Sequence, residues 1–491
     1  MSTNNGLLKN TFILSFVQIV NIVIKVLQNK IAAIVLGPSG MGVIGLFLNS
    51  ISVISTGAGL GLSQSAVRDI AAADADGNAD TVNKIFTVTN NMVYITGLLG
   101  LFITLILSYP LSLYVFGDST YTMGFIVLSI AVFCNIVSEG RLAILKGLRR
   151  FTDLAKCTVY GALSGFIIVV PLYWYLKDKG IVWALLSIAF LQFVYINIYL
   201  KKVKYQKQNY KFKEIISHSK SMITMGVSLM IVSFVTIIFN LIITSIIRSG
   251  GDFVNVGIYT AGSTILTAYF NVIISAMSTD FYPRVSAVYN DNNVLKDLVN
   301  KQCLTCLSLI FPIVVIFVFA APFFISFLYT DEFTRASEFT DYAMIGTVLI
   351  ICSNFLGIIL LAKRQSKVFL SSVISQRLFL LVVYYFCYKY WDIKGLGYAY
   401  IVTGLSDFLL MTIIMGCLHS IKLDKFIYGL LTVMLAFTFA SMYIKSFENS
   451  IVKFAVGSIL LLISLEISNF VFKTKLEINL VGFLKSKLKR K

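Results

Sequence analysis

The 491 residues are 57% apolar and only 13% charged, and their mean hydropathy is +0.85. Soluble domains are about 45–50% apolar and about 25% charged, so this composition excludes a chain of soluble domains and indicates a polytopic membrane protein. A transmembrane helix with its turn takes about 30–35 residues, which predicts about twelve to fourteen spans and leaves no room for a soluble domain.

A net charge of +18 would suggest nucleic-acid binding in a soluble protein, but it has a different explanation in a membrane protein. Lys and Arg anchor cytoplasmic loops and attract lipid headgroups, so we expect anionic membrane lipids as partners and no nucleic acid. The seven Cys residues lie scattered in apolar stretches, as buried packing residues do. Cys303 and Cys306 form one CxxC without a second pair or nearby His, so no metal site is expected.

The apolar windows predict an all-α chain of fourteen membrane helices. The first runs to about residue 36, which is too long for a signal-peptide core, so we interpret it as a membrane helix. The predicted spans are 11–35, 42–63, 85–108, 123–144, 157–176, 181–200, 221–247, 257–279, 302–329, 341–362, 369–388, 395–417, 426–444 and 451–472.

The distribution of basic residues predicts the orientation of the spans. One alternate set of loops holds most of the Lys and Arg, and its richest members are 145–156, 201–213, 363–367 and the tail from Lys485 to Lys491. By the positive-inside rule both termini are cytoplasmic, which requires an even number of spans and agrees with fourteen. The connecting loops are short, which disfavours a glycan polymerase or ligase with a large external loop.

Weak similarity between residues 215 positions apart predicts an internal duplication. Gly42 aligns with Gly257, Arg149 with Arg364, and Gly180 with Gly395. The repeat unit has six helices, so both copies cross the membrane in the same direction and form two lobes with a substrate between them. We therefore predict an N-terminal lobe over 1–200, a basic cytoplasmic linker over 201–220, a C-terminal lobe over 221–417, two additional helices over 418–472 and a basic tail over 473–491.

Polar residues inside a span are functional hypotheses, because burying an ionisable group in the bilayer is expensive. The first span carries a polar stripe along one face, made of Thr11, Ser15, Gln18, Asn21, Lys25 and Gln28. Lys25 is predicted near the midplane, facing a water-filled cavity, with packing against carbonyls as the alternative. The repeat partner of Lys25 is Asn240, which shares a helix face with Ser228, Thr236 and Thr244.

Two further sets of residues are candidates. Arg68 and Arg284 nearly coincide under the repeat at the predicted cytoplasmic mouth, where they would bind either substrate phosphate or lipid headgroups. Arg377 and Asp407 lie 15 positions on either side of Asp392 and so at one depth, which predicts an ion pair in the second lobe. Asp407 is a candidate for binding a coupling ion, H⁺ or Na⁺, and a structural bridge is the alternative.

The stretch from Lys30 to Gly42, containing Gly37-Pro38-Ser39-Gly40, resembles the first helical hairpin of bacterial O-antigen and polysaccharide repeat-unit flippases. Gly59-Leu60-Gly61, Lys146-Gly147-Leu148-Arg149-Arg150 and Pro283-Arg284 resemble further signatures of this family. These flippases belong to the multidrug/oligosaccharidyl-lipid/polysaccharide exporter superfamily. Many members have twelve spans, so the fourteen predicted here are a departure that is similar to lipid II flippases.

The resemblance implies a flippase in the bacterial inner membrane that carries undecaprenyl-diphosphate-linked oligosaccharide outward by alternating access. It implies that Lys25, Arg68 and Arg284 hold the diphosphate, and that a polysaccharide polymerase and a chain-length regulator are partners. No Gly-rich phosphate loop or Ser/His/Asp group is found, so we expect neither an enzyme nor a cofactor. A cation-coupled drug antiporter of the same superfamily is the chief alternative, and a lipid II-type flippase is another.

Overall fold

The computed structural model describes residues 2–75, 79–203, 205, 208, 212–445, 447 and 449–476, and no side chain before residue 17. The described residues form helices and turns, without a strand. They divide into two compact units, Met1–Gly257 and Ile258–Lys491. Part of the predicted linker (204, 206, 207 and 209–211), the predicted tail from residue 477 on, and the side chain of Ser228 lie outside the described residues.

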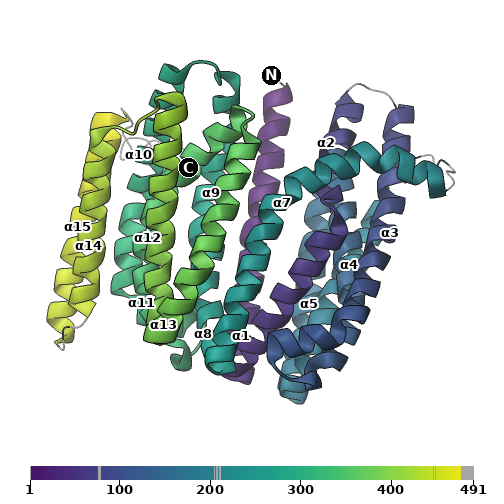
Figure 1. Cartoon of the computed structure of the whole chain (residues 1–491), viewed down its shortest axis with the longest axis horizontal. Helices are drawn as coiled ribbons and strands as arrows, with labels where there is room; N and C mark the ends of the chain where they lie inside the picture. Colours follow the sequence, from purple (N-terminus) through teal and green to yellow (C-terminus); the bar gives the residue numbers. More distant parts are fainter. Residues whose placement is uncertain are drawn as a thin grey trace. The chain divides into compact units, whose positions relative to one another are not determined.

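The helices of the first unit run side by side, as Figure 1 shows. They are α1 (Ser2–Gly59), α2 (Leu62–Ala75), α3 (Ala79–Leu111), α4 (Thr122–Gly147), α5 (Phe151–Leu176), α6 (Gly180–Leu200) and α7 (Phe212–Gly250), followed by the start of α8 (Phe253–Thr264). The amide of Asn49 on α1 donates to Thr244 on α7 at 3.3 Å. By its packing, therefore, α7 belongs to the first unit, although by the repeat it begins the second copy.

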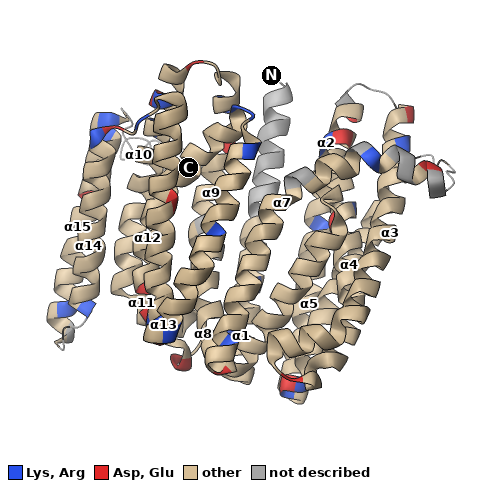
Figure 2. Cartoon of the chain, in the orientation of Figure 1, with Lys and Arg blue, Asp and Glu red and all other residues tan. Residues whose placement is uncertain are grey.

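The second unit contains the remaining helices. After the end of α8 come α9 (Asn271–Ala287), α10 (Asn292–Phe319), α11 (Ala321–Leu328), α12 (Ala336–Ala362), α13 (Ser366–His419), α14 (Lys425–Lys445) and α15 (Ser450–Lys475). Figure 2 shows that most charged residues lie at helix ends, with few along the helix middles, as expected for helices that cross hydrocarbon.

The prediction of fourteen spans is confirmed. Eleven segments of the described chain are long and apolar enough to cross a membrane. Three of these reverse direction, at Gly37 in α1, at Lys177 between α5 and α6, and at Asp392 in α13, so each supplies two crossings. Gly37 has a φ of 63°, a conformation that glycine adopts without strain.

The two units repeat the same turn geometry, which supports the predicted duplication. Arg149 and Arg364, 215 positions apart, have φ angles of 53° and 59°. Lys177 and Asp392, at the same offset, have φ angles of 49° and 50°. Non-glycine residues with positive φ are uncommon, so their recurrence in register indicates that each copy folds its hairpins in the same way.

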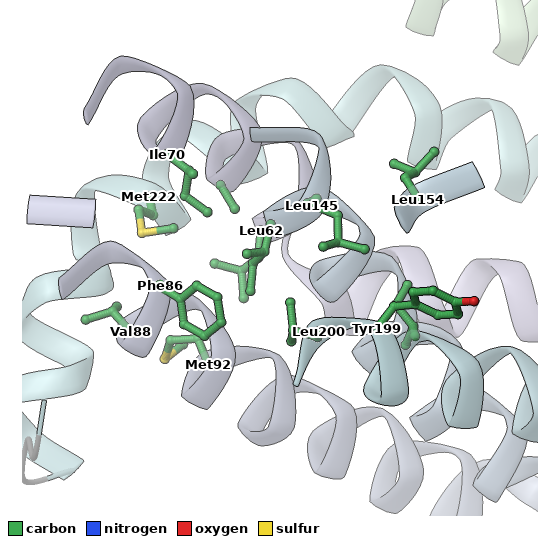
Figure 3. Close-up of a cluster of buried hydrophobic side chains, with 14 of the residues drawn as sticks. Leu62, Ile70, Phe86, Val88, Met92, Leu145, Leu154, Tyr199, Leu200 and Met222 are labelled. Atoms are coloured by element: carbon green, nitrogen blue, oxygen red, sulfur yellow. The ribbon is translucent and has the colours of Figure 1, made fainter. Parts of the chain in front are cut away.

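A buried apolar cluster in the first unit fixes the position of α2 (Figure 3). Leu62, Ala66 and Ile70 recur every fourth residue of α2, so they form one stripe, and all are at most 2% exposed. They pack with residues that include Phe86 of α3 and Leu145 of α4. Gln64 and Arg68, on another face of α2, are exposed.

The last two helices pack on the second unit. Both α14 and α15 contact α10, and α14 also contacts α12. The Lys445 ammonium at the end of α14 lies 2.6 Å from the Asp341 carboxylate on α12, and both side chains are largely buried. This ion pair and the apolar contacts hold the additional helices to the repeat.

Candidate functional site

Lys25 lies on the first arm of α1 with an exposed side chain. Val17 and Ile24 form the packed face of this arm, at 6% and 4% exposed. Gln18 is exposed like Lys25, whereas Asn21 is half-buried. No hydrogen bond or ion pair involves Lys25 within the described part of the chain. Lys25 is therefore free to bind an anion, which is the role predicted for it; the Thr11 and Ser15 side chains of the stripe lie outside the described residues.

Arg68 and Arg284 each contact a carboxylate on their own helix. The guanidinium of Arg68 donates twice to Asp69, at 2.9 and 2.8 Å. Arg284 on α9 lies 3.2 Å from Asp280. Both arginines are exposed, at 60% and 49% of the side chain. Exposed pairs of this kind contribute little, about 0–1 kcal/mol, so a phosphate could displace either carboxylate.

Asn240 lies on α7 with an exposed side chain. Its backbone carbonyl accepts a hydrogen bond from the Thr244 hydroxyl at 3.0 Å. The same hydroxyl accepts from Asn49, so α7 is fixed against α1 at this level. Asn240 thus occupies a defined position in the first unit, and its role in substrate binding stays a prediction.

Arg377 and Asp407 lie on the two arms of α13, which reverses at Asp392. The guanidinium acts electrostatically on the Asp407 carboxylate, as expected for groups at one depth of a hairpin. The neighbouring Gln376 donates to Ser406 across the arms at 3.2 Å. These contacts place the two groups in one polar cluster inside an apolar span, and the direct ion pair stays a prediction.

Buried tyrosines complete this cluster. Tyr259 on α8 and Tyr384 on α13 are 8% and 3% exposed, and both are within the electrostatic range of Arg377. The Tyr384 hydroxyl lies near Thr403 on the opposite arm. The cluster is therefore supported by groups on several helices and is more than a single pair.

Glu139 and Arg141 of α4 are charged residues that were not predicted as site residues from the sequence. Arg141 is 6% exposed and donates to Asn90 at 3.1 Å and to the Tyr94 hydroxyl at 2.5 Å. Glu139 instead lines a cavity of about 20 Å³ together with Ser63. Both residues stand inside the predicted span 123–144, so the cost of burying charge was the signal that could have found them.

The second unit has a larger cavity between α9 and α12, lined by both apolar and uncharged polar side chains. Its volume is about 620 Å³, and its polar lining consists of Ser275, Ser278, Thr279, Tyr282 and Asn354. The Asn354 amide donates to the Ser278 hydroxyl oxygen at 2.9 Å, which joins the two helices. No sequence signal separated these hydroxyls from the many Ser and Thr that bond only to their own helix.

Comparison with known proteins identifies the family. Residues 31–338 match a family model described as "Polysaccharide biosynthesis protein". The lipid III flippases of Escherichia coli K12 and Shigella flexneri are each 22% identical over 390 residues, covering 78% of this chain and 92% of theirs.

Solved structures share the fold at low identity. A lipid II flippase, MurJ, in an inward closed conformation has a TM-score of 0.72 at 13% identity, covering 96% of this chain and 100% of that one. An inward-facing multidrug transporter of the same exporter superfamily has a TM-score of 0.67 at 17% identity, covering 82% and 96%.

The resemblance inferred from the first hairpin is thus confirmed, as is the expectation that the chain is a transport protein and not an enzyme. The matched family model covers well over half of the sequence. The chain belongs to the polysaccharide biosynthesis protein family and has the fold of the multidrug/oligosaccharidyl-lipid/polysaccharide exporter superfamily.

Proposed function

We propose that the protein is a flippase that moves undecaprenyl-diphosphate-linked oligosaccharide from the cytoplasmic to the outer leaflet by alternating access. The observation that carries this proposal is the exposed Lys25 on a membrane helix, which has no partner among the described residues. A diphosphate needs a cation, the sugars need a wet cavity, and a lone ammonium in hydrocarbon would be expensive.

The substrate we favour is an O-antigen or other surface polysaccharide repeat unit. Its support is the match to a polysaccharide biosynthesis family over residues 31–338. The similarity to lipid III flippases and to a lipid II flippase structure supports a lipid-linked saccharide in general. A lipid II-type flippase is therefore the nearest alternative.

A cation-coupled drug antiporter is the second candidate function. It is favoured by Glu139, a membrane-embedded carboxylate of the kind that a cationic drug requires, and by the fold shared with a multidrug transporter. Against it stands the exposed Lys25, which would repel a cation. We propose Asp407 as the site that binds the coupling ion, H⁺ or Na⁺.

The proposed location is the bacterial inner membrane, with both termini cytoplasmic. The basic loops and tail support this orientation. A polysaccharide polymerase and a chain-length regulator are the proposed partners, because the translocated repeat unit must be polymerised after it leaves the flippase.

The test replaces Lys25 by Ala and measures surface polysaccharide together with lipid-linked oligosaccharide on the inner side of the membrane. We expect surface polysaccharide to be lost and lipid-linked units to accumulate, with rescue by Lys25→Arg, which keeps the charge. Lys30→Ala on another face of the same helix is the matched control. Normal export by a Lys25→Ala protein that inserts at the usual level would contradict the proposal.

A further inference from the structure

We propose that the cavity between α9 and α12 binds the sugar part of the substrate, an inference that rests on the flippase function proposed above. The polar residues that line it on α9 are Ser275, Ser278, Thr279 and Tyr282, spaced by three or four residues and therefore on one helix face. Ile350, Asn354 and Ile358 of α12, spaced by four, face them.

The hydrogen-bond donors and acceptors that the lining residues leave available indicate which kind of ligand the cavity can bind. The Ser275, Ser278 and Thr279 hydroxyls donate to carbonyls of their own helix, at 3.0, 2.7 and 2.8 Å. Their hydrogens are therefore used, and their oxygens face the cavity as acceptors. Asn354 offers its carbonyl oxygen as a further acceptor and, because only one N–H of its amide is engaged with Ser278, a second N–H as a donor. The lining therefore offers several acceptors together with donors at Asn354 and the Tyr282 hydroxyl, all of them uncharged, and it suits a neutral ligand that both donates and accepts hydrogen bonds.

Sugars fit this requirement and phosphates do not. Sugar hydroxyls and acetamido N–H groups are donors, whereas a diphosphate only accepts and needs cations or donors. None of the eight lining residues is charged. The three isoleucines and the Tyr282 ring provide apolar surface for the C–H faces of a sugar ring, and about 620 Å³ is within the range of small-ligand sites, roughly 300–1,000 Å³.

The predicted phosphate-binding arginine of this helix is separate from the cavity. Arg284 lies nine positions after Ser275, which at 3.6 residues per turn places it on the opposite face of α9. It contacts Asp280 on that face. The cavity therefore recognises a neutral group independently of the cation.

The first unit has a cavity at the equivalent position. Ser63 and Glu139 lie 215 positions before Ser278 and Asn354, and both line the small cavity of about 20 Å³ in that unit. Each copy thus has a cavity with polar lining residues at this position, and of these two cavities that of the second unit is large enough for sugar residues.

The test compares binding of two probes to the purified full-length protein: undecaprenyl diphosphate, and undecaprenyl diphosphate carrying an N-acetylhexosamine disaccharide. We expect the wild type to bind the glycosylated probe more tightly. Asn354→Leu and the isosteric Thr279→Val should each reduce this preference by about 3- to 10-fold, the size of one neutral hydrogen bond, without weakening the bare diphosphate.

Thr305→Val on α10 is the matched control. Its hydroxyl bonds to the Lys301 carbonyl at 2.7 Å, as that of Thr279 does to Ser275, but it does not line the cavity. Preserved preference in folded Asn354→Leu and Thr279→Val would overturn the sugar site. Equal wild-type binding of both probes would also overturn it while leaving lipid-diphosphate transport intact, whereas binding of neither probe would overturn the proposed function and this inference with it.

Discussion

The ion pair between Asp341 and Lys445 makes the attachment of the last two helices testable. The ammonium lies 2.6 Å from one carboxylate oxygen, and the side chains are 11% and 18% exposed. The second oxygen of Asp341 is buried and has no hydrogen-bond partner among the described residues. Lys445→Met would therefore leave a buried carboxylate with neither oxygen paired.

Removing one partner of a buried ion pair costs about 3–5 kcal/mol. Because both side chains retain some exposure, we expect Lys445→Met to cost about 3 kcal/mol, and Asp341→Asn less, since a long Lys side chain can move toward the membrane surface. The double variant Asp341→Asn with Lys445→Met leaves no charge behind and should recover to within about 1 kcal/mol of the wild type.

The assay is denaturation of the detergent-solubilised protein, with protease cleavage at the α14 connection as a second readout of local opening. The Lys445→Met protein should unfold earlier and be cleaved faster, and the double variant should reverse both changes. Equal stability of the wild type and Lys445→Met, or a double variant no better than the worse single variant, would show that apolar packing alone holds α14.

Three further outcomes are expected. Reversing the charge of both Arg68 and Arg284 should reduce export if they form an entry for anionic headgroups, and unchanged transport by the folded variant would make them lipid anchors only. Glu139→Leu should weaken transport without unfolding the protein, because Glu139 faces a cavity and makes no ion pair within the described residues; wild-type transport would remove it from the site. Asp407→Asn should export without dependence on the ion gradient, as measured in vesicles with and without imposed H⁺ or Na⁺ gradients, and a retained dependence would place coupling elsewhere.

Local patterns predicted the helices and their turns, because turn chemistry and apolar run length act over a few residues. The reversals near Gly37 and Asp392 are examples. Packing partners could not be predicted in this way. The assignment of α7 to the first unit follows from contacts such as Asn49 with Thr244, which are 195 positions apart. The predicted span 42–63 ended where α2 begins, and no separate helix was predicted there, although Leu62, Ala66 and Ile70 have helical spacing.

The residues of the candidate site, too, could be predicted from the sequence only in part. A charged group in an apolar span is visible in the sequence, so Lys25, Arg377 and Asp407 were predicted, and Glu139 could have been. Uncharged acceptors are not visible, because Ser and Thr in membrane helices commonly bond to their own backbone. Only the position of Asn354 opposite Ser278 distinguishes a cavity lining from ordinary helix residues.

Comparison of equivalent positions in the two copies distinguishes residues that the fold requires from residues that transport requires. The turns at Arg149 and Arg364 have kept the same geometry, because each copy must reverse its helices whatever it carries. The polar groups inside the spans have not been kept. Glu139 corresponds to Asn354, and Ala162 and Gln192 correspond to Arg377 and Asp407. Since charges in a membrane are retained only at a cost, this divergence indicates that the two lobes have specialised. The first unit contributes the exposed cation Lys25, and the second contributes a neutral cavity and a separate charged cluster.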